Sequence, residues 1–169
     1  MDIEIRPYRK ADLPAMREIW NETVEAGNAF PQRDCLSSKE ASVFFQEQTC
    51  SCVAVDQKTG VVVGLYILHP NAVGRCSHIA NASYAVWSVM RSRGIGRKLV
   101  VHSLHQAKLH GFRILQFNAV VSSNAAARRL YEQMGFVKLG TIPGGFHADD
   151  DRYLDIVLYY HDLMNLENI

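Results

Sequence analysis

The sequence has almost no excess of charge and no long apolar run. Its 18 lysines and arginines nearly balance 17 aspartates and glutamates, so no overall field attracts nucleic acid or an anionic membrane, and an anion site would have to be local. No segment approaches the ~18 apolar residues that a membrane span needs, and the N-terminus has no apolar stretch with a cleavage site. We therefore predict a cytoplasmic protein with no nucleic-acid partner and no membrane partner.

Cysteine is scarce, and its spacing does not indicate a metal site. The cysteines are Cys35, Cys50, Cys52 and Cys76. They form no CxxC pair and no zinc spacing with the seven histidines, so we expect reduced thiols and no metal. Cys50 and Cys52 would share one face of a strand, where packing is the simpler expectation than metal binding. His102 and His105 lack a carboxylate partner at helical spacing, and we expect both at the surface.

Repeats, low-complexity segments and Pro/Gly/Ser-rich linkers are also absent from the sequence. A chain of 169 residues has the length of one domain and can bury roughly 70% of the surface that the unfolded chain exposes. We therefore predict one domain over residues 1–169.

Strand-like and helix-like segments alternate along the chain. Strands are expected at residues 3–6, 52–55, 61–68, 78–87, 112–121, 137–142 and 153–160. Helices are expected to begin after Asp12, at a Ser37-x-x-Glu40 capping box, at Ile95 and after Asn124. The strand, helix, strand order of residues 78–121 predicts a parallel crossover.

Two glycines stand among four cations just before the third expected helix, in the segment MRSRGIGRKL, residues 90–99. Glycines at 94 and 96 let the backbone approach a ligand, and a helix N-terminus offers unpaired N–H groups and a favourable dipole. The cations either add charge or are solvated residues of a helix end. The segment matches neither the P-loop nor the dinucleotide-binding motif, because Arg97 and Leu99 stand where a lysine and a third glycine are required. The turn therefore predicts a phosphate site.

Two motifs give the chain a resemblance to a known family. Residues 91–96 match R/Q-x-x-G-x-G/A, and residues 124–136 match N-x-x-A-x-x-L-Y-x-x-x-G-F. Through both, the chain resembles the GNAT superfamily of N-acetyltransferases. The resemblance implies an α/β (α+β) fold with a mixed, central, splayed sheet of about seven strands flanked by about four helices. It also implies acetyl-CoA as co-substrate, direct transfer of acetyl to an amine, and a homodimer as one possible assembly.

The resemblance implies which residues bind acetyl-CoA. The turn would hold the pyrophosphate, and the pantetheine arm would lie between strands 78–87 and 112–121, where backbone groups polarise the thioester carbonyl. Asn124 would contact the arm, or it caps the helix without further function. The implied cofactor-binding residues are Ala85, Val86, Trp87, Arg91, Ser92, Arg93, Gly94, Ile95, Gly96, Arg97, Asn124, Ala127 and Tyr131.

The resemblance assigns proton transfer less completely. Tyr131 corresponds to the tyrosine that protonates the departing CoA thiolate, and a phenol with a pKa near ~10 suits that role, although it could also be a packed helix residue. Residues 79–85 contain no carboxylate to act as general base. His78 is the nearest titratable candidate. The alternative is a water chain held by backbone carbonyls and Asn81 or Ser83.

The acceptor site is expected on the two splayed strands. Asn81 and Asn118 are polar residues in apolar runs, so they bind either a small polar acceptor or neighbouring backbone. Residues 66–82 are similar to the P-N-x-x-x-R-C-S-H-x-x-N-A run of fungal acetyltransferases that act on azetidine-2-carboxylate. This similarity implies a small amino acid or proline analogue as acceptor, bound by both asparagines. Phe30 lies in the region that shapes the acceptor pocket in the family, or it belongs to the core.

Two other functions remain open from the sequence. A protein lysine or N-terminal acetyltransferase would need an open groove beside the cofactor, whereas the aromatic residues before residue 50 favour a closed pocket. A non-catalytic acyl-CoA sensor would have no need of Tyr131. The leading hypothesis is a small-molecule N-acetyltransferase.

Overall fold

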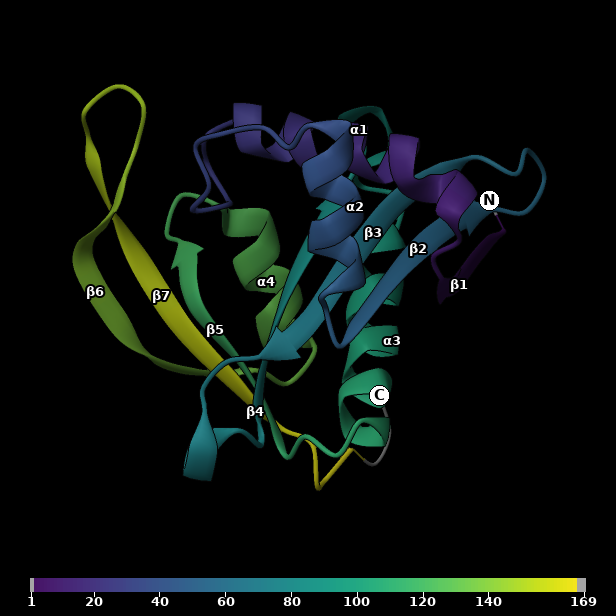
Figure 1. Cartoon of the computed structure of the whole chain (residues 1–169). Coiled ribbons are helices and arrows are strands. Elements are labelled where there is room, and N and C mark those ends of the chain that lie inside the picture. Colours follow the sequence, from purple (N-terminus) through teal and green to yellow (C-terminus); the bar gives the residue numbers. More distant parts are fainter. Residues whose placement is uncertain (1, 167–169) are drawn as a thin grey trace.

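The structure is a computed structural model that describes residues 2–166. One seven-stranded sheet runs in the order β1-β2-β3-β4-β5-β7-β6 (Figure 1). Its strands are β1 (Ile3–Pro7), β2 (Cys50–Asp56), β3 (Val62–Pro70), β4 (Ile79–Val86), β5 (Ile114–Val121), β6 (Val137–His147) and β7 (Tyr153–Asp162). The helices are α1 (Leu13–Glu25), α2 (Ser38–Gln46), α3 (Ile95–Leu109) and α4 (Ala125–Gln133), with short 3-10 turns η1 (Lys10–Asp12), η2 (Gly74–Cys76) and η3 (Ser88–Met90). Within the described range, no helix is long and apolar enough to cross a membrane.

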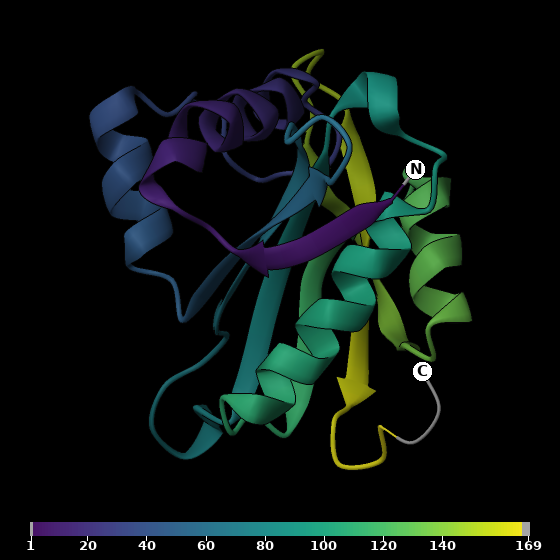
Figure 2. The same ribbon diagram turned by 90° about the vertical axis from the view of Figure 1, so that its right-hand side faces the viewer.

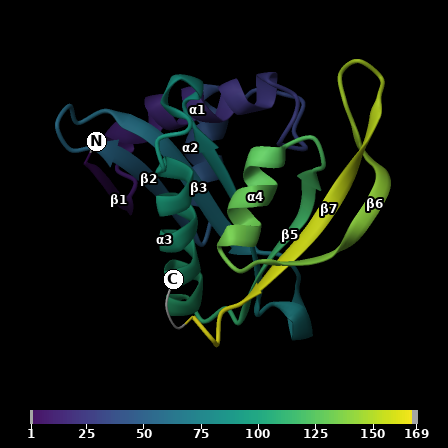
Figure 3. The same cartoon turned by 180° about the vertical axis from the view of Figure 1, so that it is seen from behind.

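The helices cover both faces of the sheet and enclose two apolar clusters (Figure 2). On one face, α1 and α2 pack Trp20 and Phe45 against Leu65. On the other face, α3 packs Leu99 against Tyr66 of the same strand, and Figure 3 shows α3 in front of β2 and β3, with α4 in front of β5 and β7. Because β3 is buried on both faces, it is the centre of the fold, and the predicted mixed α/β (α+β) class with four helices is confirmed.

The sheet is split between β4 and β5. These strands are parallel, as the predicted crossover requires, but they pair only at Ile79 with Ile114 and Ala80 with Leu115. β4 continues to pair with β3 as far as Val86, and β5 pairs with β7 on its other side. The predicted splay is therefore confirmed as a gap that opens toward the C-terminal ends of β4 and β5.

The start of α1 differs in detail from its prediction. Asp12 stands at the N-cap position, but its side chain does not cap α1. The carboxylate instead binds the Arg6 guanidinium at 2.7 and 3.0 Å and accepts the Arg9 N–H at 2.6 Å, which closes η1 before the helix begins. The capping box of α2 forms as predicted, with reciprocal bonds between Ser37 and Glu40.

The last hairpin is longer than predicted. The segment after Ile142 was expected to be a loop, yet β6 continues to His147 through a register shift between Ile142 and Phe146. Pro143 is tolerated because β6 is an edge strand, where a missing N–H breaks no ladder bond. Gly144, with a φ of +62°, accommodates the irregular backbone.

Candidate active site

The gap between β4 and β5 exposes unpaired backbone groups of β4. The N–H of Trp87 donates to the Val63 carbonyl of β3 at 3.1 Å. Because successive residues of a strand turn their N–H groups to alternate edges, the N–H of Ala85 also turns toward β3, whereas those of Tyr84 and Val86 turn toward the gap. Three residues, Ala85, Val86 and Trp87, are predicted to polarise a thioester carbonyl. Of their N–H groups, only that of Val86 turns toward the gap, because the other two turn toward β3.

The predicted phosphate turn lies directly after β4 and leads into α3. Gly94 is the N-cap of α3 with a φ of +76°, and Ser92 has a φ of +61°. No side chain caps the helix, and nothing lies within 4 Å of the position that a Gly94 Cβ would take. The first N–H groups of α3 are thus open to a ligand.

Positive charge surrounds this turn. The four cations Arg91, Arg93, Arg97 and Lys98 are all exposed, and none of them forms an ion pair with a carboxylate of residues 2–166. Residues 91–97 come together in one turn at the open end of the gap. An amide-lined, positively charged turn beside an unpaired strand edge fits a diphosphate joined to an extended arm, which is the shape of coenzyme A.

A contact from α1 fixes the beginning of this turn, and the sequence did not reveal it. The Glu22 carboxylate accepts the Ser88 N–H at 2.9 Å and the Ser88 hydroxyl at 2.6 Å. Both partners are unremarkable polar residues that lie 66 positions apart in the chain. No local motif could have paired them.

Tyr131 of α4 lies among aromatic rings. Its ring centroid is 4.4 Å from that of Phe117 and 5.6 Å from that of Phe136. Burial raises the pKa of Tyr131 above its usual value, so the phenol remains protonated at neutral pH. Its hydroxyl forms no hydrogen bond within residues 2–166 and is not fully enclosed, because Trp20 Nε1 is the one enclosed side-chain nitrogen or oxygen without a partner in that range. An accessible, protonated phenol is suited to donating a proton.

Asn124 caps α4, as one of its two predicted roles requires. Its side-chain oxygen accepts the Ala127 N–H at 3.2 Å. Within the described chain, the amide NH₂ of Asn124 has no hydrogen-bond partner, so the capping bond leaves a donor for a second role.

The structure brings Asn81 and Asn118 together through a third asparagine. The Asn71 side-chain oxygen accepts from Asn118 Nδ2 at 2.5 Å and from Asn81 Nδ2 at 3.4 Å, and Asn71 Nδ2 donates to Asn118 Oδ1 at 3.3 Å. Gln116 Nε2 also donates to Asn118 Oδ1 at 3.0 Å. We call these four residues the amide cluster. Asn71 lies within residues 66–82, but its contacts with Asn81 and Asn118 could not be predicted from the spacing of these residues in the sequence.

The amide cluster faces the same side of the sheet as α1 and α2. Ala80 and Ala82 pack toward α3, so the alternation of β4 turns Asn81 and Ala85 to the opposite face. Asn81 Oδ1 accepts no hydrogen bond from any residue between 2 and 166, while its amide group also has a spare donor. The cluster can therefore accept from an amine and donate to a carboxylate.

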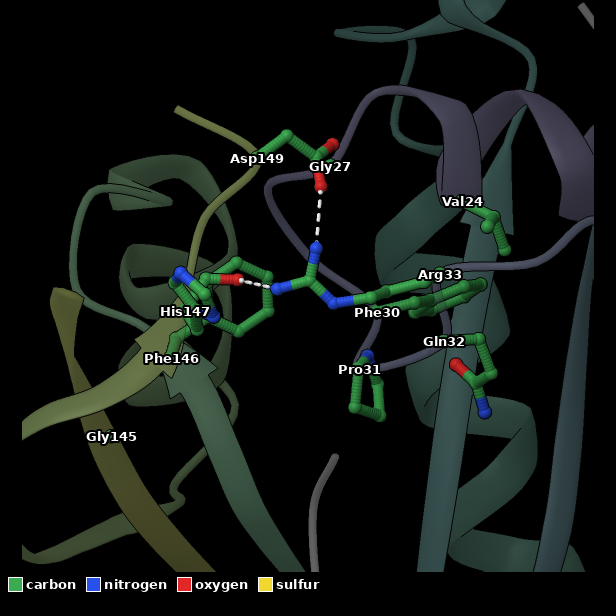
Figure 4. A pocket seen from close by; sticks show the side chains of 10 residues that line it. All are labelled: Val24, Gly27, Phe30, Pro31, Gln32, Arg33, Gly145, Phe146, His147 and Asp149. Atoms are coloured by element: carbon green, nitrogen blue, oxygen red, sulfur yellow. Dashed lines mark hydrogen bonds and ion pairs between the residues drawn. The ribbon is translucent and has the colours of Figure 1, made fainter. Parts of the chain in front are cut away.

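A pocket of about 200 Å³ lies between the loop after α1 and the β6–β7 hairpin (Figure 4). Arg33 bridges its two walls, with Nη1 3.1 Å from Asp149 Oδ1 and Nη2 donating to the His147 carbonyl at 3.1 Å. Phe30 packs on Trp20 at a centroid distance of 4.3 Å, as its predicted core role requires, and it also lines this pocket, while its role toward the acceptor stays a prediction. Arg33 was missed, because its partner lies 116 positions away.

His78 lies at the closed end of the gap. It precedes β4 at the end where β4 and β5 still pair, and its carbonyl accepts the Arg113 N–H at 2.9 Å. Ala85 is seven positions further along the strand, a distance of about 23 Å at ~3.3 Å per residue. His78 is therefore far from Ala85 but only three residues from Asn81 of the amide cluster, so its role as general base stays a prediction.

Comparisons with known proteins agree with this geometry. A family model described as the acetyltransferase (GNAT) family matches residues 13–136. The N-acetyltransferase aca1 of Schizosaccharomyces pombe is 31% identical over 172 residues, covering 92% of this chain and 82% of aca1. The L-amino acid N-acyltransferase MnaT of Escherichia coli is 26% identical over 144 residues, covering 83% of each chain.

Solved structures show the same architecture. A GCN5-related N-acetyltransferase from Kribbella flavida has a TM-score of 0.87 at 32% identity, covering 95% of this chain and 97% of that chain. The yncA protein of Salmonella typhimurium, solved with its cofactor acetyl-CoA, has a TM-score of 0.88 at 22% identity, covering 96% of this chain and 95% of that chain. Because the family model spans most of the chain and aca1 is similar over nearly all of it, the chain belongs to the GNAT family and is an acetyl-CoA-dependent N-acetyltransferase.

Proposed function

We propose that this acetyltransferase acetylates the amine of a small amino acid or proline analogue by direct attack. The amide cluster carries the proposal, because its free donors and acceptor match a carboxylate and an amine held close together. The similarity of residues 66–82 to azetidine-2-carboxylate acetyltransferases supports the same class of acceptor. So does the similarity to MnaT, which is named as an L-amino acid N-acyltransferase.

Acetyl-CoA supplies the activated thioester. We assign its pyrophosphate to the amides of residues 91–97 and the charges of the exposed arginines. The Val86 N–H turns toward the gap and is the donor placed to polarise the thioester carbonyl. Asn124 and Ala127, at the start of α4, would border the pantetheine arm.

Acceptor binding is assigned to the amide cluster, in which Asn81 belongs to β4 and Asn118 to β5. Asn81 and Asn118 would orient the amino acid, and Asn71 holds these two side chains in place. Phe30 and Arg33 line a pocket of about 200 Å³ that shares no residue with the amide cluster, and a pocket of this size would admit a small acceptor better than a peptide.

Two protons must move: one to the CoA thiolate that leaves, and one from the attacking amine. Tyr131 would donate its proton to the departing thiolate, since its pKa is raised by burial and the phenol is protonated at neutral pH. Because β4 carries no carboxylate, the amine proton would pass to His78 or to ordered water held by gap-facing carbonyls and by Asn81 or Ser83.

A thiol-release assay with acetyl-CoA tests the proposal against a panel of acceptors. The panel contains amino acids, azetidine-2-carboxylate, other proline analogues, polyamines, aminoglycosides and short peptides. We expect turnover with amino acids or proline analogues and little with peptides. Turnover with peptides alone would favour a protein acetyltransferase, and binding of acetyl-CoA without any turnover would favour a sensor.

A further inference from the structure

A second group of reactive side chains lies away from the gap. Cys50 and Cys52 of β2, Tyr66 of β3, and His102 and His110 at α3 form what we call the thiol cluster. β2 is two strands away from β4 in the sheet order. Cys52 and Tyr66 belong to the apolar cluster between the sheet and α3, which Figure 3 shows in front of β2 and β3. Acetyl transfer as proposed above uses none of the five residues.

The two sulfur atoms are already in contact. Cys50 Sγ and Cys52 Sγ are 3.3 Å apart, and both cysteines are free. Cys52 has no exposed surface, whereas Cys50 is only partly buried and can be reached by a small molecule. Cys50 and Cys52 therefore lie on the same face of β2, as predicted. Cys50 is partly exposed, and the Cys52 sulfur beside it is enclosed.

Hydrogen-bond donors converge on Cys50. Tyr66 Oη is 3.8 Å from Cys50 Sγ and 2.8 Å from His102 Nδ1. His102 is therefore half-buried and bonded, unlike the surface residue that the sequence predicts. The hydrogen bond from Cys52, with further help from Tyr66 and His110, lowers the pKa of Cys50 to about 6, although burial opposes the shift. The Cys50 thiolate and burial raise the pKa of Cys52.

Oxidation of a dithiol requires one accessible thiolate and a second thiol beside it, and Cys50 and Cys52 meet these two requirements. The thiolate is the nucleophile, and an accessible thiolate beside a second thiol is oxidised selectively. We propose that Cys50 and Cys52 form a hydroperoxide-reactive dithiol, in which Cys50 is oxidised and Cys52 resolves the product.

The chemistry balances with a hydroperoxide as the oxidant. The Cys50 thiolate attacks the terminal oxygen of the hydroperoxide, the O–O bond breaks, and the alkoxide or hydroxide that leaves takes up a proton. Cys50 becomes a sulfenic acid. The Cys52 sulfur then attacks Cys50 Sγ, the S–O bond breaks, water leaves with the Cys52 proton, and a disulfide forms. Two thiols lose two electrons, and the hydroperoxide is reduced to an alcohol or water.

The strand geometry makes this disulfide reversible. Two strand residues span about 6.6–6.8 Å, which lies at the upper end of the usual Cα separation for a disulfide. Cys50 is the first residue of β2 and pairs with Leu68 of β3, while the pairing with β1 begins only at Cys52. A bridge at this separation would be strained, and the strain would favour reduction by cellular thiols.

The first test is the pH dependence of alkylation in the full-length protein. Trypsin places Cys35, Cys76 and the Cys50/Cys52 pair on three separate peptides, so mass spectrometry follows each rate with iodoacetamide. We expect the alkylation of Cys50 to reach half its maximum at least about one pH unit below that of Cys35, whose pKa is raised by burial and Glu25. Tyr66→Phe should move the Cys50 midpoint upward. A Cys50 midpoint equal to or above that of Cys35 would overturn the proposal.

The second test is a hydrogen peroxide titration. At a dose that leaves Cys35 and Cys76 reduced, the peptide of residues 40–58 should lose two hydrogen atoms, and dithiothreitol should restore them. In Cys52→Ala, the same dose should instead give a dimedone adduct at Cys50. Oxidation of Cys35 or Cys76 before the pair would contradict the proposal. Sulfinic acid at Cys50 of the wild type, with no disulfide, would exclude Cys52 as the resolving thiol.

Discussion

At the scale of single residues, Tyr131 has an enclosed ring and an accessible hydroxyl. Because burial raises the pKa of Tyr131 above its usual value of about 10, the acid form persists through and beyond the neutral range. We expect Tyr131→Phe to lower kcat on the order of 10²-fold or more and to leave the Kd of acetyl-CoA unchanged, since the ring packing is kept. Thiol release and calorimetry measure the two quantities. An unchanged kcat would rule out the proton-donating role.

Asn81 offers a second test at a single residue. Replacing it with alanine removes the free acceptor but leaves the bonds between Asn71 and Asn118. We expect Asn81→Ala to raise the KM of the amino-acid acceptor about tenfold, the cost of roughly one unpaired polar group, without a change in the KM of acetyl-CoA. Asn165→Ala, on the exposed C-terminal segment, is a matched control. An equal rise for acetyl-CoA would place Asn81 at the cofactor instead.

Residues that act through a local motif could be predicted, and residues that act through distant partners could not. The turn around Gly94 and the segment containing Tyr131 follow from contiguous patterns. Glu22, Asn71 and Arg33 acquire their roles from partners 47 to 116 positions away.

At the scale of elements, Gly94 and Gly96 of the phosphate turn are required for different reasons. A side chain at Gly94 would be strained at a φ of +76°, whereas a Gly96 Cβ would only touch Leu130 Cδ2 at 3.5 Å. We expect Gly94→Ala to lower the free energy of unfolding by about 1–2 kcal/mol. Gly96→Ala should leave that free energy nearly unchanged and still raise the KM of acetyl-CoA. Urea unfolding and initial rates separate the effects. If Gly96→Ala binds acetyl-CoA normally, the backbone there does not approach the ligand.

The ion pair before α1 should make stability depend on pH. The hydrogen bond from Arg6 lowers the pKa of Asp12, so the pair stabilises the fold above the ordinary carboxyl pKa and loses that contribution as the pH falls through the lowered value. We expect Asp12→Asn to reduce the free energy of unfolding on the order of 1–3 kcal/mol at pH 7 and progressively less below pH ~4. Urea titrations at several pH values test this. The exposed pair of Arg152 and Asp150 provides the control, because Asp150→Asn should have little effect.

Element types were predictable from periodicity, while two boundaries depended on tertiary structure. The capping box of α2 is a local motif and formed as expected. The sequence predicts Asp12 as a helix cap, but its carboxylate binds Arg6 of β1 instead, because a charged guanidinium is a stronger partner than a backbone N–H. Pro143 and the two following glycines predict a loop, but β6 pairs with β7 on both sides of them, at Ile142 and again at Phe146.

At the scale of the whole molecule, the splayed sheet leaves β4 and β5 without mutual pairing beyond Ala80 and Leu115. The facing backbone groups of β4 and β5 therefore lack hydrogen bonds to each other. A ligand arm that binds in the gap should supply such bonds and so stabilise the folded state. A ligand that binds only the folded state at 100 times its Kd contributes about 2.7 kcal/mol. For a chain of this size, acetyl-CoA should therefore raise Tm by roughly 5–10 °C.

Differential scanning fluorimetry measures that shift, and salt and the glycine variants identify its source. Raising the ionic strength should reduce the shift, because the four exposed cations of the turn are screened from the phosphates. Gly96→Ala should lose most of the shift while keeping the Tm of the free protein, whereas Tyr131→Phe should keep both. A shift that survives in Gly96→Ala and at high salt would mean that the arm in the gap, and not the phosphate turn, supplies most of the binding free energy.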